Sequence, residues 1–202
     1  TRQEAEAALR ACLVDRQFGD AGRSVLVEEY LEGEETSLLA LVSDGQVLAL
    51  APAQDYKRAL DGDAGPNTGG MGSYSPVPAV DEGTAAFIVD QIVRPTVAEL
   101  GRRGVSYRGV LYAGVILTSA GPKVLEFNCR FGDPETQVLI PRMRSDLLQL
   151  LWATAQGETL PARADWEPGP CVGVVMASKG YPAGNSKGDV ISGIAEAEDV
   201  DG

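Results

Sequence analysis

The sequence predicts an α+β protein in which helices flank a mixed or antiparallel sheet. Two turns favour antiparallel pairing. Apolar runs at 36–42 and 46–51 are joined by Ser43-Asp44-Gly45-Gln46. An Asp-Gly pair between such runs is typical of a tight hairpin, because both central residues take positive φ. The turn at 119–122 joins the apolar run 109–118 to the run 123–130 in the same way. Helical spacing of apolar residues elsewhere predicts the helices that cover the sheet.

The composition excludes several classes of function. The chain has 202 residues, of which 44% are hydrophobic and 23% charged, enough for one large domain or two small ones. The net charge of −12 argues against a nucleic-acid partner. No histidine is present, which excludes imidazole bases and ligands. Cys12, Cys129 and Cys171 are far apart in the sequence and form no C-x-x-C pair. This spacing indicates reduced thiols rather than a disulfide framework or a zinc site. With apolar runs well short of the ~20 residues of a membrane span, we expect a cytoplasmic protein without a membrane partner.

The first element is a predicted helix. Thr1 and Glu4 fit a capping box, and apolar residues at 5, 9, 12 and 13 extend the helix to about Arg16. Because the chain begins inside this helix without a methionine, we expect that an upstream part is missing. Residues 24–31 are typical of a strand that ends in charge. Two carboxylates at such a strand end are by themselves more often solvated than functional.

A long glycine-rich stretch, 55–80, shows no periodic pattern. Connections of this length are either functional or disordered. Their glycines allow backbone N–H groups to line an anion. The stretch matches neither the Walker P-loop nor the dinucleotide G-x-G-x-x-G motif. Composition alone leaves a binding loop and a flexible surface loop about equally favoured.

The second half predicts further helices and strands. A helix capped by Asp81 and closed by Gly104 is expected to kink at Pro95. Residues 109–118 are almost continuously apolar, so both faces of that strand should be covered.

A further helix should open near Glu135, break at Pro141 and resume at 145 or 146, ending at Gly157. We predict a first domain over residues 1–157, a proline-rich linker over 158–170, and the start of a small β-rich C-terminal domain over 171–202. The last of these opens with a buried-type strand at 171–177.

The strand predicted at 123–130 carries the chemistry. Side chains alternate along a strand, so Glu126, Asn128 and Arg130 share one face. A carboxylate and an amide oxygen suit Mg²⁺, which takes one or two protein ligands and completes its shell with water and phosphate oxygens. A neighbouring guanidinium suits the phosphates. The pattern therefore predicts a magnesium–nucleotide site. Taken alone, an exposed polar face on an edge strand is the commoner explanation.

Four segments together resemble the phosphoribosylamine–glycine ligase (glycinamide ribonucleotide synthetase) family, of the ATP-grasp superfamily. They are residues 28–35, 54–58, 65–76 and 126–135. The resemblance covers nearly the whole chain and implies an ATP-grasp domain over 1–157, truncated at its N-terminal side. It implies an enzyme of de novo purine biosynthesis that joins glycine to 5-phosphoribosylamine through an acyl phosphate, using ATP and Mg²⁺ or Mn²⁺. In this family the lysine and the Gly-rich loop that clamp the nucleotide precede the first helix of this chain, so we expect the fragment alone to be inactive. For the intact enzyme the resemblance implies a monomer.

The resemblance also assigns roles. Glu126 and Asn128 bind the metal, and Arg130 lies beside the transferred phosphoryl group. For the nucleotide, the backbone of Glu29 and Leu31 pairs with the adenine edge, Glu28 lies near the adenine amino group, and Glu35 accepts from the ribose hydroxyls. Lys57 and Arg58 join Arg130 as catalytic residues. The residues assigned to substrate binding are Asp55, Asn67, Gly69, Gly70, Met71, Gly72 and Asp133.

Two alternatives stay open. One is another ATP-grasp carboxylate–amine ligase, against which the loop 67–76 weighs. The other is a non-catalytic nucleotide-binding or scaffold module, which the missing upstream part favours.

Overall fold

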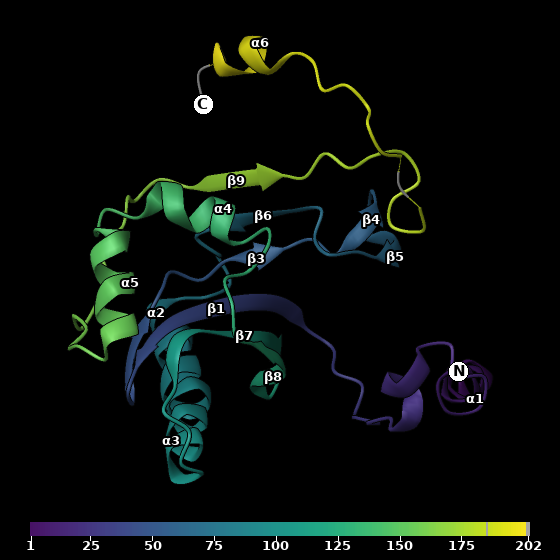
Figure 1. The fold of residues 1–202 in the computed structure, drawn as a ribbon, viewed down its shortest axis with the longest axis horizontal. Coiled ribbons are helices and arrows are strands. Elements are labelled where there is room, and N and C mark those ends of the chain that lie inside the picture. The colour runs from purple at the N-terminus through teal and green to yellow at the C-terminus, as the bar shows by residue number, and fades with distance from the viewer. Residues whose placement is uncertain (185, 201–202) are drawn as a thin grey trace. The chain divides into compact units, whose positions relative to one another are not determined.

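The structure, a computed structural model, describes residues 1–184 and 186–200. The chain divides into two compact units, Thr1–Leu31 and the remainder from Glu32 onward. Figure 1 presents the elements in chain order. Each unit is described below by itself.

The first unit consists of α1 (Arg2–Leu13) and the short 3₁₀ helix η1 (Gly19–Arg23). The predicted capping box is confirmed: the Thr1 side chain accepts a hydrogen bond from the Glu4 backbone N–H, and Glu4 Oε2 accepts one from the Thr1 backbone nitrogen at 2.6 Å. The strand predicted at 24–31 is wrong, because those residues, all of which the structure describes, form no β-ladder. A ladder needs a second strand, and the fully described Thr1–Leu31 unit contains none.

An antiparallel sheet of four strands dominates the second unit, in the order β2-β1-β7-β8. The strands are β1 (Glu34–Ser43), β2 (Gln46–Ala49), β7 (Arg108–Thr118) and β8 (Gly121–Asn128). Asp44 and Gly45 have φ of 45° and 92°, as the predicted hairpin requires. The second predicted hairpin, β7–β8, is confirmed as well.

The two faces of this sheet carry separate apolar clusters, so both faces of β7 are covered as predicted. Leu39, Leu41 and Tyr112 pack towards α4 and α5, with Val138 and Leu150. The opposite face packs on the helices that follow residue 81. Its cluster comprises Leu38, Ala40, Val42, Ile88, Ile92, Val93, Val97, Leu111, Ala113 and Val115. Figure 1 shows α2 and α3 on one side of the sheet and α4 and α5 on the other.

The helices follow the predicted breaks. Asp81 caps α2 (Glu82–Ile88), and a π-helical turn η2 (Val89–Val93) leads into α3 (Arg94–Arg102) with Pro95 in its first turn. The next helix, α4 (Thr136–Leu139), ends in the 3₁₀ turn η3 (Ile140–Arg142), and α5 (Leu147–Gln156) ends at Gly157 with φ of 74°. A short α6 (Ile194–Glu198) lies near the end of the chain. Within the described residues, no helix combines the length and apolarity that a membrane crossing requires.

The glycine-rich stretch is more ordered than its sequence suggests, which corrects the prediction of a patternless loop. It forms β3 (Gln54–Asp55), a hairpin of β4 (Arg58–Leu60) with β5 (Ala64–Asn67), and β6 (Gly72–Ser75). Strand β6 pairs with β3 on one side and with β9 (Cys171–Val174) on the other. These strands are too short for alternation to be visible in the sequence, so only pairing with partners further along the chain reveals them.

Strand β9 is not of the buried type that its apolar sequence predicts. Val172 and Val174 are 70% and 81% exposed. The reason is that β9 is an edge strand with only one covered face, where Gly173 approaches Val138.

The segment that precedes β9 is packed into the second unit. Leu160 and Ala164 are buried, and Arg142 donates to the carbonyls of Glu167 and Gly169. The domain boundary predicted at 158–170 stays a prediction.

Candidate nucleotide and metal site

Strand register brings the predicted metal ligands onto the polar end of the α4–α5 face of the main sheet. Ser37 pairs with Gly114, which pairs with Glu126 on β8. Tyr112 pairs with Asn128 two positions further. Residues that are paired across antiparallel strands point to the same face. Glu126 and Asn128 therefore share a face with Ser37 and Tyr112, which is the arrangement that the alternation predicts.

A β-bulge lies directly before these ligands. Gly114 pairs with Glu126 but the next residue, Val115, pairs with Val124, so Leu125 is the extra residue of β8. Such a bulge resets which residues face the core and is common beside functional sites. Gly114 also leaves room for the carboxylate, since a Cβ there would lie 3.0 Å from Glu126 Cγ.

Glu126 and Asn128 are accessible and lie side by side. Glu126 is exposed, Asn128 is half-buried, and Asn128 Nδ2 donates to Glu126 Oε1 at 3.4 Å. Within residues 1–184 and 186–200, no group of three or more His, Cys, Asp or Glu side chains could hold a metal alone. The donor set thus fits a hard cation that takes two protein oxygens and fills its shell with water and phosphate.

Lys57 lies among carboxylates beside this pair. Its Nζ donates to Glu35 Oε2 at 2.7 Å and lies 3.8 Å from Asp55 Oδ1. Glu126 is close enough to raise the pKa of Lys57. Strand β3 reaches this place because Ala53 forms a bridge with Ser37 of β1, so β3 runs along β1.

Burial perturbs two ionisable groups of this cluster. The Asp55 side chain is only 6% exposed, and burial raises its pKa to about 6, with Glu135 and Glu35 adding to the rise and Lys57 opposing it. Burial also lowers the pKa of Lys57, but its hydrogen bond to Glu35 and the charges of Asp55, Glu35 and Glu126 outweigh this and leave the pKa above its ordinary value. The lysine is therefore held as a cation.

The raised pKa of Asp55 predicts a pH-dependent stability. The folded protein binds the Asp55 proton more tightly than the unfolded chain does, so this group's contribution to stability is largest below about pH 4 and is lost as the pH rises through 6. We expect the free energy of unfolding of the wild type, relative to Asp55→Asn, to fall by about 2–3 kcal/mol between pH 4 and pH 7. Urea titrations at each pH measure this.

The exposed hairpin residue Asp61 provides the control. Asp61→Asn should follow the wild type over the same pH range. A difference between wild type and Asp55→Asn that stays constant with pH would contradict the buried, proton-binding carboxyl.

The predicted substrate loop packs on the turn that follows β8. Gly70 has φ of +123°, and a Cβ at this position would overlap the Pro134 ring. Ser73 Oγ donates to the Pro134 carbonyl at 2.8 Å. The loop's own amides are largely satisfied: Met71 N donates to Tyr56 O at 2.7 Å and Gly70 N to Thr68 Oγ1 at 3.0 Å. The structure thus brings this loop next to the turn that carries Asp133.

Other predicted residues make local contacts. Arg58 Nη1 donates to Gly65 O at 2.6 Å and braces the β4–β5 hairpin, which also carries the exposed Asn67. Arg130 lies beyond the end of β8, exposed, with Nη1 donating to Phe131 O at 2.8 Å. The strand alternation that groups Arg130 with Glu126 therefore ends before Arg130 is reached.

Asp133 and Gly69 each make a hydrogen bond to a residue outside the predicted site. Asp133 accepts from Gln137 Nε2 at 2.7 Å, and Gly69 N donates to Tyr181 Oη at 3.0 Å. Glu28, Glu29 and Leu31 belong to the first unit, where both glutamates are exposed and Leu31 is half-buried.

Glu135 is a site residue that the sequence reasoning missed. It is 2% exposed, and its Oε1 accepts from Ser37 Oγ and from Tyr112 Oη, both at 2.9 Å. Burial, first, and the Glu135 charge raise the pKa of Tyr112. Only the place of Glu135 at the head of the helix after Pro134 was visible in the sequence, which does not distinguish a buried carboxylate from a solvated one.

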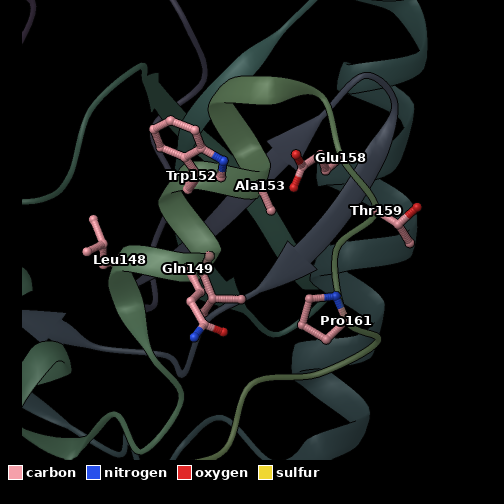
Figure 2. Close-up of a pocket in the computed structure, with 8 residues that line it drawn as sticks. Leu148, Gln149, Trp152, Ala153, Glu158, Thr159 and Pro161 are labelled. Atoms are coloured by element: carbon pink, nitrogen blue, oxygen red, sulfur yellow. The ribbon is translucent and has the colours of Figure 1, made fainter.

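A pocket of about 680 Å³ lies elsewhere, against α5 and the chain after it (Figure 2). Trp152 and Leu148 contribute its apolar wall, and Glu158 its carboxylate. None of the predicted site residues lines it, and its lining includes no basic side chain that would suit a phosphate.

Solved structures of several enzymes have this fold. The phosphoribosylamine–glycine ligase from Thermotoga maritima is 34% identical, with a TM-score of 0.72 over 79% of this chain and 40% of that chain. N5-carboxyaminoimidazole ribonucleotide synthetase from Thermus thermophilus shares the fold at 19% identity and a TM-score of 0.58, over 88% of this chain and 43% of that one. The fold is thus that of the ATP-grasp enzymes.

The sequence comparisons are more specific. The model of the family described as "Phosphoribosylglycinamide synthetase, ATP-grasp (A) domain" matches residues 1–136, and the chain belongs to this family. It is 49% identical to the phosphoribosylamine–glycine ligase of Yersinia pestis over 203 residues, which cover 100% of this chain and 47% of the relative. The Pseudomonas aeruginosa protein of that name is also 49% identical, over 98% of this chain and 47% of the relative. The chain therefore spans about half the length of these relatives.

Proposed function

We propose that this chain is the metal- and nucleotide-binding part of an ATP-dependent ligase that joins glycine to 5-phosphoribosylamine, giving glycinamide ribonucleotide, ADP and phosphate in de novo purine biosynthesis. The substrates are those in the names of relatives that are 49% identical over the chain. The proposal includes small-molecule substrates, ATP as the nucleotide and a divalent cation as cofactor. It also includes a cytoplasmic location. A monomeric intact enzyme remains part of the same proposal.

One observation carries the proposal. Glu126 and Asn128 lie side by side on the sheet face that also presents Glu35, and Lys57 contacts both Glu35 and Asp55 of the neighbouring strand β3. A ligase of this kind needs no side-chain nucleophile, and the chain has no histidine to act as an imidazole base. It needs anionic reactants brought together and their charge neutralised.

The residues divide that work. Glu126 and Asn128 supply the oxygens for Mg²⁺ or Mn²⁺, which when bound neutralises charge on the nucleotide phosphates. Lys57, held as a cation, and the exposed Arg130 supply positive charge for the transferred phosphoryl group. Arg58 would act with them.

The remaining roles concern the ligands. Asp55 and Asp133, with the 67–72 segment (Asn67, Gly69, Gly70, Met71 and Gly72), would hold glycine and 5-phosphoribosylamine. The glycine carboxylate would take the terminal phosphoryl group of ATP with release of ADP, and the amine of 5-phosphoribosylamine would attack the resulting acyl phosphate, forming the amide and releasing phosphate. Glu35 would accept from the ribose hydroxyls of ATP, while Glu28, Glu29 and Leu31 contact the adenine.

A chimera tests this function. The chain replaces the matching segment of the Yersinia pestis relative, and phosphate release from ATP is measured with the parent enzyme as control. Release that requires both glycine and 5-phosphoribosylamine is expected. Dependence on another acid–amine pair would instead favour a different ATP-grasp ligase. No release above background would favour a non-catalytic nucleotide-binding or scaffold module.

A further inference from the structure

A buried carboxylate lies directly beneath the proposed site and takes no part in the roles assigned above. Glu135 is 2% exposed, while its two hydroxyl partners, Ser37 and Tyr112, are 1% and 4% exposed. Both hydroxyls donate to Oε1 at 2.9 Å, and their oxygens lie 2.7 Å from each other. We propose that Glu135 is a positioning residue, which fixes the turn 130–134 to strands β1 and β7 and thereby sets the spacing between the metal-binding strand and the substrate loop.

The first step is the attachment of the turn 130–134 to the main sheet through Glu135. The turn begins where β8 ends and closes at Glu135, the N-cap residue of α4. Ser37 lies in β1 and Tyr112 in β7, so one carboxylate oxygen joins the turn to both central strands of the main sheet. Gly132 is packed so closely that a Cβ there would overlap the Glu135 carboxylate. The turn is therefore held from two directions.

The second step leads from the turn to the substrate loop. Pro134, which directly precedes Glu135, accepts from Ser73 Oγ at 2.8 Å and fills the space beside Gly70. The loop lies in or next to β6, which belongs to the second sheet rather than to the main one. The turn thus packs directly on this loop while it is held to the main sheet, alongside the bridge between Ala53 and Ser37 that sets β3 along β1.

The third step leads from the anchor to the metal ligands. Tyr112 pairs with Asn128, and Ser37 pairs with Gly114, the partner of Glu126. The two hydroxyls that bind Glu135 therefore come from the strand positions that face the metal pair. The charge of Glu135 also contributes to the raised pKa of Asp55, so its influence reaches the opposite side of the site.

The energetics favour an anchor over a passive core residue. A buried carboxylate is costly unless it is hydrogen-bonded, and hydrogen bonds to charged groups are stronger than neutral ones. An apolar residue would fill the same space without that cost. Keeping a charged group here therefore ties the local geometry to two particular hydroxyls.

Deuterium exchange of the full 202-residue chain tests the anchor. Tyr112→Phe and Ser37→Ala each remove one donor, and each should speed exchange about tenfold both in the turn and α4 and in the segment 70–73. Ser43→Ala is the matched control, because Ser43 is an equally buried serine on the same strand whose hydroxyl donates to Glu158 O at 2.8 Å. It should leave both segments unchanged. Glu135→Gln should have the larger effect; if it does not fold, the two hydroxyl variants still decide.

The outcomes separate a positioning role from a general stabilising one. Faster exchange confined to the two segments supports the proposal. Uniformly faster exchange, or equal effects of Ser43→Ala, would show a merely structural group and overturn it, as would no change. The catalytic consequence rests on the proposed function: in the chimera, Tyr112→Phe should lower kcat by roughly 10–100-fold with the KM for ATP unchanged. A chimera without substitutions that shows no activity would refute the proposed function. The exchange result would still decide whether Glu135 positions the turn.

Discussion

Glu126→Gln in the chimera is expected to lower turnover by at least ~100-fold while leaving the fold intact. The amide keeps the size of the side chain but loses the charge that a divalent cation requires. Glu126 is exposed, so the loss of its charge should not change the free energy of unfolding by more than about 0.5 kcal/mol. Phosphate release as a function of Mg²⁺ concentration measures the effect, and the concentration for half-maximal activity should rise.

A control glutamate separates the site from general charge. Glu82, exposed in the first turn of α2, belongs to no part of the proposed site. Glu82→Gln should retain full turnover. A Glu126→Gln enzyme with unchanged Mg²⁺ dependence would refute the assignment of Glu126 as a metal ligand.

Gly70→Ala should destabilise the protein by roughly 2–4 kcal/mol. Two causes combine. The φ of +123° at Gly70 is one that side chains rarely adopt, and the new Cβ would overlap the Pro134 ring. Urea denaturation of the 202-residue chain measures the loss.

Gly101→Ala is the opposite case. Gly101 lies within α3, and a Cβ there would meet nothing within 4 Å. Alanine should therefore stabilise the chain by about 0.5–1 kcal/mol, because it forms helix better than glycine. A Gly70→Ala variant that is as stable as the wild type, while Gly101→Ala is stabilised, would contradict the close packing of the loop on the turn.

Much of the fold could be predicted because its signals are local. The capping box at Thr1, the Asp44-Gly45 turn and the breaks at Pro95 and Pro141 each depend on the geometry of a few neighbouring residues. The incorrect predictions concern segments in which pairing with another strand decides whether a β-strand forms. Residues 24–31 have the composition of a strand but no ladder within their unit, and the short strands after residue 54 find partners far along the chain.

The order of residues alone was enough to place Glu126 and Asn128 on one face, because alternation along a strand is a property of the backbone. It was also enough to identify the family through its motifs, which the comparisons confirm. The folded chain was needed to show that Lys57 lies between Glu35 and Asp55, and that Glu135 is buried against Ser37 and Tyr112. Burial and charge contacts depend on which distant strands and turns pack together, and no local pattern of residues encodes that.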